Sequence, residues 1–179
     1  MLDVESLLSG PQRMPTPRGL LASLGLLVVA TVAACSSDDT TEEVPVTNLG
    51  YTLSFPSKQA AIATDTVKVY VFPADAVCAD LIQAQRSGAA LPAPVAEAAE
   101  APICDYLSGA AGVFELGGGT YTVLAIGLRS DRDFLVGCGQ RQNDESTVPT
   151  PIFLGLADET QSVPETTCTL LAAKCAGSC

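Results

Sequence analysis

Alternating apolar and polar positions mark the most regular part of this chain. Residues 66–72 read TVKVYVF, which places Val67, Val69 and Val71 on one face of an extended segment. A two-residue period built from β-branched side chains predicts a strand. A second segment, 120–128 (TYTVLAIGL), is apolar on both faces. It therefore predicts a strand in the centre of its sheet.

Turn residues divide the neighbouring sequence into further short strands. The glycines at 117–119 separate a brief alternation at 113–116 from the strand over 120–128. The charged turn at 129–133 leads into 134–139, which we expect to pair with 120–128 as a hairpin. Shorter candidate strands lie at 51–55, 152–156 and 166–172.

Two segments break this strand pattern. Residues 78–85 (CADLIQAQ) have the i, i+3, i+4, i+7 spacing of one short helix. Residues 88–102 (GAALPAPVAEAAEAP) predict a Pro/Ala-rich loop, with room for one helical turn at 95–101. About seven short strands with Gly/Pro turns predict an all-β protein, a two-sheet antiparallel β-sandwich with one short helix.

An uncharged apolar run, GLLASLGLLVVATVAA, occupies positions 19–34 behind Arg18. It is shorter than the ~20 residues that span a bilayer comfortably. A positive flank, a short apolar region and small residues at its end are the parts of a secretory signal. The sequence therefore predicts an export signal over residues 1–34. An uncleaved membrane anchor, or an ordinary signal peptide cut near Ala33 or Ala34, are the alternatives.

The end of this run, Val32-Ala33-Ala34-Cys35, resembles the lipobox of bacterial lipoproteins. The resemblance implies that the Cys35 thiol receives a diacylglyceryl group, that the chain is cut before it, and that the freed amine is acylated with a fatty acid such as palmitate. Two or more acyl chains hold a protein stably at a membrane. Ser36, in place of the aspartate associated with inner-membrane retention, implies the outer membrane.

The residues around this signal complete the predicted organisation. Asp3 and Glu5 are unusual before a signal whose start should be basic, so we expect translation to begin at Met14. Residues 36–47 (SSDDTTEEVPVT) predict a flexible acidic tether, with an acidic recognition tail as the alternative. The domains expected are thus a signal over 1–34, a tether over 35–49 and a single sandwich over 50–179.

The glycine-rich hairpin carries a second resemblance. Residues 114–123 (FELGGGTYTV) are similar to the strand–glycine–G-x-Y-x-V hairpin of transthyretin-like and carboxypeptidase regulatory-like sandwiches, over a match from 113 to 137. The resemblance implies that Tyr121 packs at a sheet edge. It also implies a non-catalytic accessory sandwich, transthyretin-like or immunoglobulin-like. The Pro/Ala-rich loop and the cysteine-rich tail depart from that pattern.

Besides Cys35 the chain has six cysteines: Cys78, Cys104, Cys138, Cys168, Cys175 and Cys179. An even number in an exported protein favours disulfides, although sequence cannot choose among the connectivities. We expect Cys78–Cys104, closing the Pro/Ala-rich loop, and Cys138 bonded to one of the three C-terminal cysteines. A zinc site from those three lacks a fourth ligand, and a catalytic dithiol lacks the C-x-x-C spacing.

Composition restricts the function further. The chain has 20 acidic and 9 basic residues, no histidine and a net charge of −11. Removing residues 1–34 takes away two residues of each sign and leaves that charge unchanged. An acidic surface repels phosphate backbones, so no nucleic-acid partner is expected. Without histidine, Ser-His and Cys-His nucleophile systems are excluded, and no cofactor is expected.

Few residues remain as candidates for a catalytic or ligand site. Ser57 and Lys58 could form a Ser/Lys pair, but neighbours on a strand point to opposite faces, and a turn after Pro56 is the preferred interpretation. Asp131 and Asp133 could act as paired acids or hold calcium weakly, but they lack the spacing of a calcium loop. Tyr70 and Phe72 mark either a binding patch or a face that other elements cover.

The leading hypothesis is a membrane-anchored lipoprotein that is not an enzyme. Its sandwich would bind a protein or envelope component, or serve as a structural module. A hydrolase using carboxylate or Ser/Lys chemistry is one alternative. A calcium-binding or small-ligand-binding sandwich is another, and the small ligand would need a cavity of roughly several hundred Å³.

Overall fold

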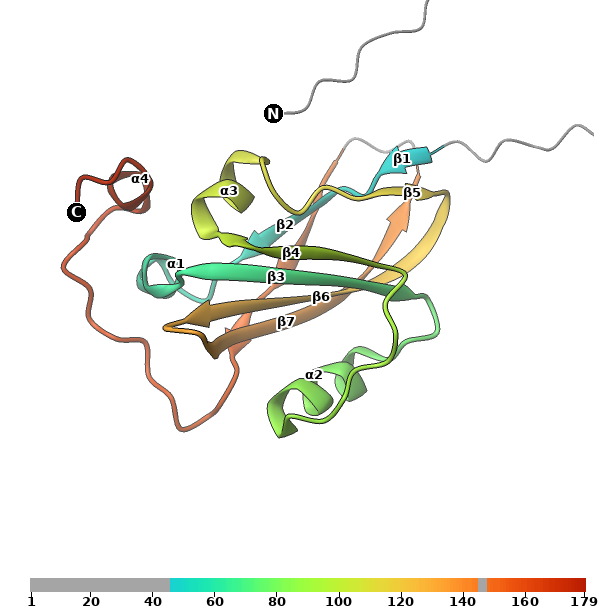
Figure 1. Cartoon of the computed structure of the whole chain (residues 1–179), viewed down its shortest axis with the longest axis horizontal. Coiled ribbons are helices and arrows are strands. Elements are labelled where there is room, and N and C mark those ends of the chain that lie inside the picture. The colour runs from blue at the N-terminus through green and yellow to red at the C-terminus, as the bar shows by residue number, and fades with distance from the viewer. Residues whose placement is uncertain (1–45, 145–147) are drawn as a thin grey trace, which may run out of the picture. The chain divides into compact units, whose positions relative to one another are not determined.

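A computed structural model describes residues 46–144 and 148–179 of the chain (Figure 1). The expected signal, Cys35 and most of the expected tether therefore lie outside the described residues. Within the described ranges, no helix has both the length and the apolar character needed to cross a membrane.

A five-stranded antiparallel sheet, in the order β4-β3-β6-β7-β9, forms the centre of the described domain (Figure 1). Strand β6 lies between β3 and β7, and every residue from Thr122 to Leu128 is buried, as expected for a central strand. The bounds are β3 Thr66–Pro73, β4 Ala96–Pro102, β6 Gly119–Arg129, β7 Arg132–Asn143 and β9 Gly155–Leu156.

The predicted hairpin joins β6 to β7. Its two turn residues, Ser130 and Asp131, have φ values of 49° and 60°. Two consecutive positive φ angles are the mark of the tight turn that suits the twist of paired strands. The backbone N–H of Ser130 donates to the Asp65 carboxylate at 3.0 Å, so the turn is also held by the residue before β3.

Two further strand pairs lie outside this sheet. Strand β1 (Val46–Asn48) pairs antiparallel with β5 (Glu115–Gly117). Strand β2 (Tyr51–Ser54) pairs parallel with β8 (Thr150–Phe153), which corrects the expectation of purely antiparallel pairing. Parallel partners need a long connection, and here almost the whole central sheet separates β2 from β8 in the sequence.

The domain has four short helices where one was predicted. The predicted helix at 78–85 is α2 (Cys78–Ser87). The others are α1 (Lys58–Ala63), α3 (Ile103–Ser108) and α4 (Leu171–Cys175). They have five or six residues each, too few for a helical period to stand out in sequence. The strand predicted at 166–172 is wrong, because α4 begins within it.

The predicted Pro/Ala-rich loop is also partly wrong, because its second half is strand β4. Alanine and glutamate are uncommon in strands, so local composition did not indicate one. Pairing with β3 decides the conformation, with a register shift between Val67 and Val69. The Lys68 ammonium lies 2.9 Å from the Glu100 carboxylate, which joins the two strands at the surface.

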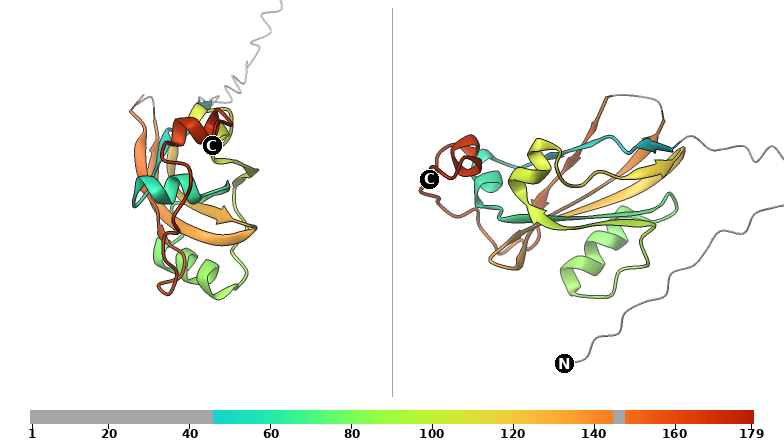
Figure 2. Two further views of the ribbon diagram at one scale, coloured as in Figure 1. Left: turned by 90° about the vertical axis from the view of Figure 1, so that its left-hand side faces the viewer. Right: turned by 45° about the horizontal axis from the view of Figure 1, so that its top comes forward.

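Side chains from the two faces of the sheet pack into separate clusters. On one face, Val67, Val69 and Val71 pack with residues of β6, β7 and β8. On the other, Phe72 is fully buried in a cluster that includes Leu81 of α2. Figure 2 shows α2 lying apart from the other three helices, which gather at one end of the sheet. The Phe72 face is therefore covered and forms no surface patch.

Three disulfides join the six cysteines of the described domain, so the expectation of disulfides is confirmed. The pairs are Cys78–Cys138, Cys104–Cys175 and Cys168–Cys179. The expected Cys78–Cys104 bond, and the bond from Cys138 to a C-terminal cysteine, are wrong. Because the segment after α2 becomes strand β4 on the far side of β3, it carries Cys104 away from Cys78 and toward α4.

Candidate functional site

The residues that the sequence analysis considered for catalysis, and set aside, have structural roles. Ser57 caps the start of α1, where its hydroxyl accepts a hydrogen bond from the Ala60 N–H at 3.1 Å. Lys58 is exposed on the same helix. A serine that caps a helix is a common structural arrangement, and these contacts bring no base to its hydroxyl.

The two hairpin aspartates also point to no shared site. Asp131 is exposed at the tip of the turn. Asp133 accepts a hydrogen bond from the Gln85 side-chain amide of α2 at 2.5 Å. Over residues 46–144 and 148–179, no group of three or more His, Cys, Asp or Glu side chains gathers in a way that could hold a metal ion.

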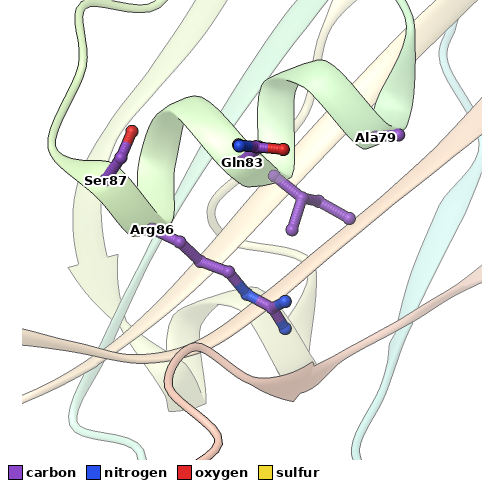
Figure 3. Close-up of a pocket in the computed structure, with 5 residues that line it drawn as sticks. Ala79, Gln83, Arg86 and Ser87 are labelled. Atoms are coloured by element: carbon purple, nitrogen blue, oxygen red, sulfur yellow. The ribbon is translucent and has the colours of Figure 1, made fainter.

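One hollow lies along α2 and measures about 480 Å³ (Figure 3). Ala79, Gln83 and Arg86 line it together with two other residues of the same helix. Arg86 extends from the helix and donates to the Leu156 carbonyl oxygen at 3.1 Å. A hollow lined by one helix alone is a shallow surface, and it lacks the converging walls of a ligand pocket.

A second depression has walls from several elements, and we call it the tyrosine groove. It is lined by residues 49–53, by Tyr106 and Leu107 of α3, by the loop after α3, and by Pro149. Its volume is 310 Å³, and no lining residue is charged. This volume is within the range of small-ligand pockets, but the groove opens to the surface and is not an internal cavity of the domain.

Two tyrosines from distant segments meet at one glycine in this groove. The Tyr51 hydroxyl donates to the Gly112 carbonyl oxygen at 2.7 Å. A Cβ atom placed on Gly112 would overlap both the Tyr106 ring and the Tyr51 hydroxyl, and Gly112 has a φ of +74°. Because glycine adopts positive φ without steric cost, this position lets both rings approach the loop.

Burial raises the pKa of both phenols above the ordinary value of 10.0, so they are neutral well beyond pH 7. Desolvation raises the pKa of Tyr106 to about 12. The pKa of Tyr51 is raised further, mainly by burial and also by the neighbouring Tyr106. The Tyr106 hydroxyl oxygen is buried and has no hydrogen-bond partner among the described residues. The groove therefore offers apolar walls and neutral hydroxyls, a surface for binding and not for proton transfer near pH 7.

Exposed apolar side chains lie in this groove and beside its lining in the sequence. Leu107 is 46% exposed and Val113 is 58% exposed, and both line it. Val148, which is 75% exposed, directly precedes the lining residue Pro149. We call these three residues the apolar rim. The lining of the groove begins at Leu49, three positions after the start of β1 at Val46, so the groove is close in sequence to the point where the described chain begins. Figure 1 draws β1, β2 and α3 above the central sheet.

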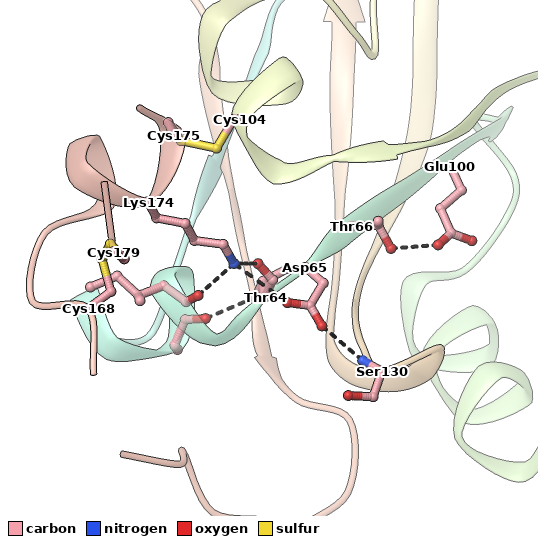
Figure 4. Close-up of polar contacts among 12 residues, drawn as sticks. Thr64, Asp65, Thr66, Glu100, Cys104, Ser130, Cys168, Lys174, Cys175 and Cys179 are labelled. Atoms are coloured by element: carbon pink, nitrogen blue, oxygen red, sulfur yellow. Dashed lines mark hydrogen bonds and ion pairs between the residues drawn. A yellow bond between two sulfur atoms is a disulfide. The ribbon is translucent and has the colours of Figure 1, made fainter. Parts of the chain in front are cut away.

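The C-terminal segment fixes the helical wall of the groove (Figure 4). The Cys104–Cys175 disulfide links α3, which carries Tyr106, to α4. The Lys174 ammonium of α4 donates to the carbonyl oxygens of Ile62 at 2.7 Å and Thr64 at 2.5 Å. A cation at the end of a helix satisfies carbonyl groups that have no partner within the helix. Helix α4 therefore holds α3 and the end of α1 together.

Comparison with known proteins gave no relative: no family model, no curated protein and no solved structure matches this chain. Sequence reasoning did not identify the tyrosine groove either. Its tyrosines stand 55 positions apart in the sequence, at 51 and 106. The one local signal was the close pair of glycines at 109 and 112, which end α3 and turn the chain back.

Proposed function

We propose that this protein is a bacterial lipoprotein held at the cell envelope by lipid on Cys35. The observation that carries the proposal is Val32-Ala33-Ala34-Cys35 at the end of a short apolar run. Acyl chains on that cysteine anchor a protein that needs no transmembrane helix. The destination we infer is the outer membrane, because Ser36 follows the cysteine.

The pairing of the other cysteines supports export. The chain has seven cysteines, and six of them pair with one another. Disulfides of this density are typical of oxidising compartments such as the periplasm. Because those six cysteines are bonded to one another, none of them is left to form a disulfide with Cys35. This leaves Cys35 for another role, such as lipid attachment.

The domain that the lipid anchors is, in this proposal, a two-layer β-sandwich. The first core cluster contains Ile152 of β8 and Leu53 of β2 together with Val69 of the central sheet. Such packing supports a second layer formed by the β2–β8 pair. The Tyr121 hydroxyl donates to the Gly117 carbonyl oxygen at 3.0 Å, across the glycine turn that resembles transthyretin-like hairpins.

We infer a binding or structural role for this sandwich, with no catalytic activity. The Ser57 hydroxyl and the Asp133 carboxylate are held in a helix cap and an amide contact. The tyrosine groove is uncharged and partly apolar, which suits a contact surface for an envelope component. These features support binding over hydrolysis.

The test is the intact mass of protein extracted from membranes, before and after reduction. We expect a chain that begins at Cys35 and carries a diacylglyceryl group and one further acyl chain. We also expect six thiols that react with an alkylating reagent only after reduction. An unmodified Cys35, or six reactive thiols without reduction, would overturn the proposal.

A matched pair of variants adds a second readout. Cys35→Ser leaves the apolar run in place, so it could stay in the membrane as an uncleaved precursor, and fractionation alone does not decide. Incorporation of radioactive palmitate does decide. We expect Cys35→Ser to lose the label and Ser36→Ala, the control next to it, to retain it. Equal labelling of the two variants would contradict the role of Cys35.

A further inference from the structure

We propose that the tyrosine groove and its apolar rim (Leu107, Val113 and Val148) dock onto the neutral lipid interface of the bilayer that holds the anchor. This inference rests on the proposed lipid at Cys35. It goes further by naming the face of the domain that turns toward the membrane and the chemistry that this face contacts.

The distribution of exposed apolar side chains supports this orientation. Across the described residues, seven large hydrophobic side chains are exposed, and three of them form the apolar rim. Clusters of exposed apolar groups mark interaction surfaces, whereas single ones are common everywhere. Here two residues of the rim, Leu107 and Val113, line the groove together with Tyr51 and Tyr106. Tyrosine is enriched where one end of a side chain meets lipid and the other meets water.

The position of the groove along the chain supplies the second argument. Strand β1 begins at Val46, and the lining of the groove begins at Leu49. Val46 stands eleven positions after Cys35, and an extended chain of that length spans at most about 40 Å. A flexible chain of that length has an end-to-end distance of roughly 18 Å. Lipid on Cys35 therefore keeps the bilayer close to the groove.

Tethering also lowers the affinity that docking requires. A surface joined to its target by a short flexible linker meets it at an effective concentration in the millimolar range. A contact of three aliphatic side chains, too weak to recruit a free protein, is then enough to orient an anchored one. The lipid anchor holds the protein at the membrane, and contacts of the apolar rim orient the domain on it.

Charge identifies the lipid class. No residue that lines the groove is charged, but Asp105 precedes Tyr106 and Glu115 follows shortly after Val113. Acidic groups beside the contact, in a chain with a net charge of −11, are repelled by anionic headgroups. The surface therefore suits zwitterionic lipid, and added anionic lipid should weaken the contact.

The experiment uses the full acylated protein in phosphatidylcholine vesicles and measures oxidation of side chains by hydroxyl radicals. Val113 and Val77 are a matched pair, because they are 58% and 56% exposed and Val77 lies just before α2, away from the groove. We expect Val113 to be oxidised several-fold less than Val77. Equal oxidation in protein whose mass shows acylation would overturn docking and leave the anchor intact. Missing acylation would overturn the proposed function itself.

Variants separate the bilayer from other occupants. Val113→Asp should raise oxidation of Leu107 toward that of the exposed Val95, while the control Val77→Asp should not. Replacing part of the phosphatidylcholine with phosphatidylglycerol should raise oxidation of Val113. Protection that grows with protein density in the vesicle would show pairing of two copies and overturn the proposal. Protection that persists unchanged in Val113→Asp, or in anionic vesicles, would also overturn it.

Discussion

Cys78, the first residue of α2, is bonded to Cys138 in β7, across 60 residues of sequence and with the two Cα atoms 5.5 Å apart. The bond holds α2 against the second face of the central sheet, where Leu81 packs with the buried Phe72. A single covalent link thus closes the face that would otherwise expose an aromatic side chain of β3.

Removal of the Cys78–Cys138 disulfide should lower the free energy of unfolding substantially. A disulfide stabilises largely by restricting the unfolded chain, and a loop of this length corresponds to about 4 kcal/mol. We expect the double variant Cys78→Ala/Cys138→Ala to lose close to that free energy of unfolding. The control is Cys168→Ala/Cys179→Ala, which opens a separation of 11 residues and should cost about 3 kcal/mol or less. Urea unfolding measures both, and an equal or larger loss in the control would contradict the prediction.

Gly112 should tolerate alanine far less well than Gly88. Both have positive φ, +74° and +67°, which alone costs an alanine about 1–2 kcal/mol. At Gly88 nothing lies within 4 Å of the added Cβ, whereas at Gly112 it overlaps two tyrosine side chains. Overpacking adds about 1–3 kcal/mol. Gly112→Ala should therefore lower the unfolding free energy clearly more than Gly88→Ala. Similar losses would show that the Tyr51 and Tyr106 side chains move aside at little energetic cost.

Replacing each groove tyrosine with phenylalanine should change the unfolding free energy differently. Tyr51→Phe removes the hydrogen bond to the Gly112 carbonyl and should cost about 1 kcal/mol. Tyr106→Phe removes a buried hydroxyl that has no partner among the described residues, so its effect should be neutral or stabilising. Thermal unfolding at neutral pH compares the pair. A larger loss for Tyr106→Phe would contradict the assigned contacts.

Alkaline pH should destabilise the fold through these same phenols. The folded pKa of Tyr106 is raised by burial from 10.0 to about 12, and that of Tyr51 is raised further. The folded state thus holds both protons more tightly than the unfolded state does. Their contribution to stability is complete below pH ~10 and is lost as pH rises from ~10 through ~12. Unfolding at pH 8 and pH 11 should show this decline, and Tyr106→Phe should make it shallower.

Lys174 should contribute to stability although it lies in the short terminal helix. Its ammonium donates to the carbonyls of Ile62 and Thr64 at the end of α1. Hydrogen bonds with a charged partner contribute about 1.5–3 kcal/mol, so Lys174→Met should cost about 2 kcal/mol. Lys58 lies at an exposed position of α1, so Lys58→Met should change the unfolding free energy by no more than about 0.5 kcal/mol. Equal effects in urea unfolding would show that α4 docks without this contact.

Sequence periodicity located the strands that have enough length to show it. The segments 66–72 and 120–128 became β3 and β6, and the two-sided apolar character of the second correctly predicted its central position. The helix at 78–85 was found for the same reason, as two turns suffice for a 3.6-residue period. Strand β4 had no such signal, because its alanines and glutamates are poor strand formers and its partner β3 imposes the conformation.

The cysteine pattern predicted that disulfides form but not which cysteines pair. An even set of six predicted disulfides, but proximity in sequence suggested the wrong partners. Bonding requires Cα atoms roughly 4.4–6.8 Å apart, and only the packing of α2 on β7 brings Cys78 and Cys138 to 5.5 Å. The tyrosine groove has the same origin, because Tyr51 and Tyr106 approach each other only when α3 folds back beside β2.

By itself, then, the sequence determined the strand-rich class, the central strand, the use of cysteine in disulfides and the lipobox-like segment on which the proposed anchor depends. These are properties of short windows, in which neighbouring residues determine the outcome. The parallel β2–β8 pair, the disulfide partners and the uncharged groove were decided by the tertiary structure. The β2–β8 pair, the groove and two of the disulfides, Cys78–Cys138 and Cys104–Cys175, join segments more than 50 residues apart. Contacts over such separations are fixed by packing of the whole core, which no local pattern encodes.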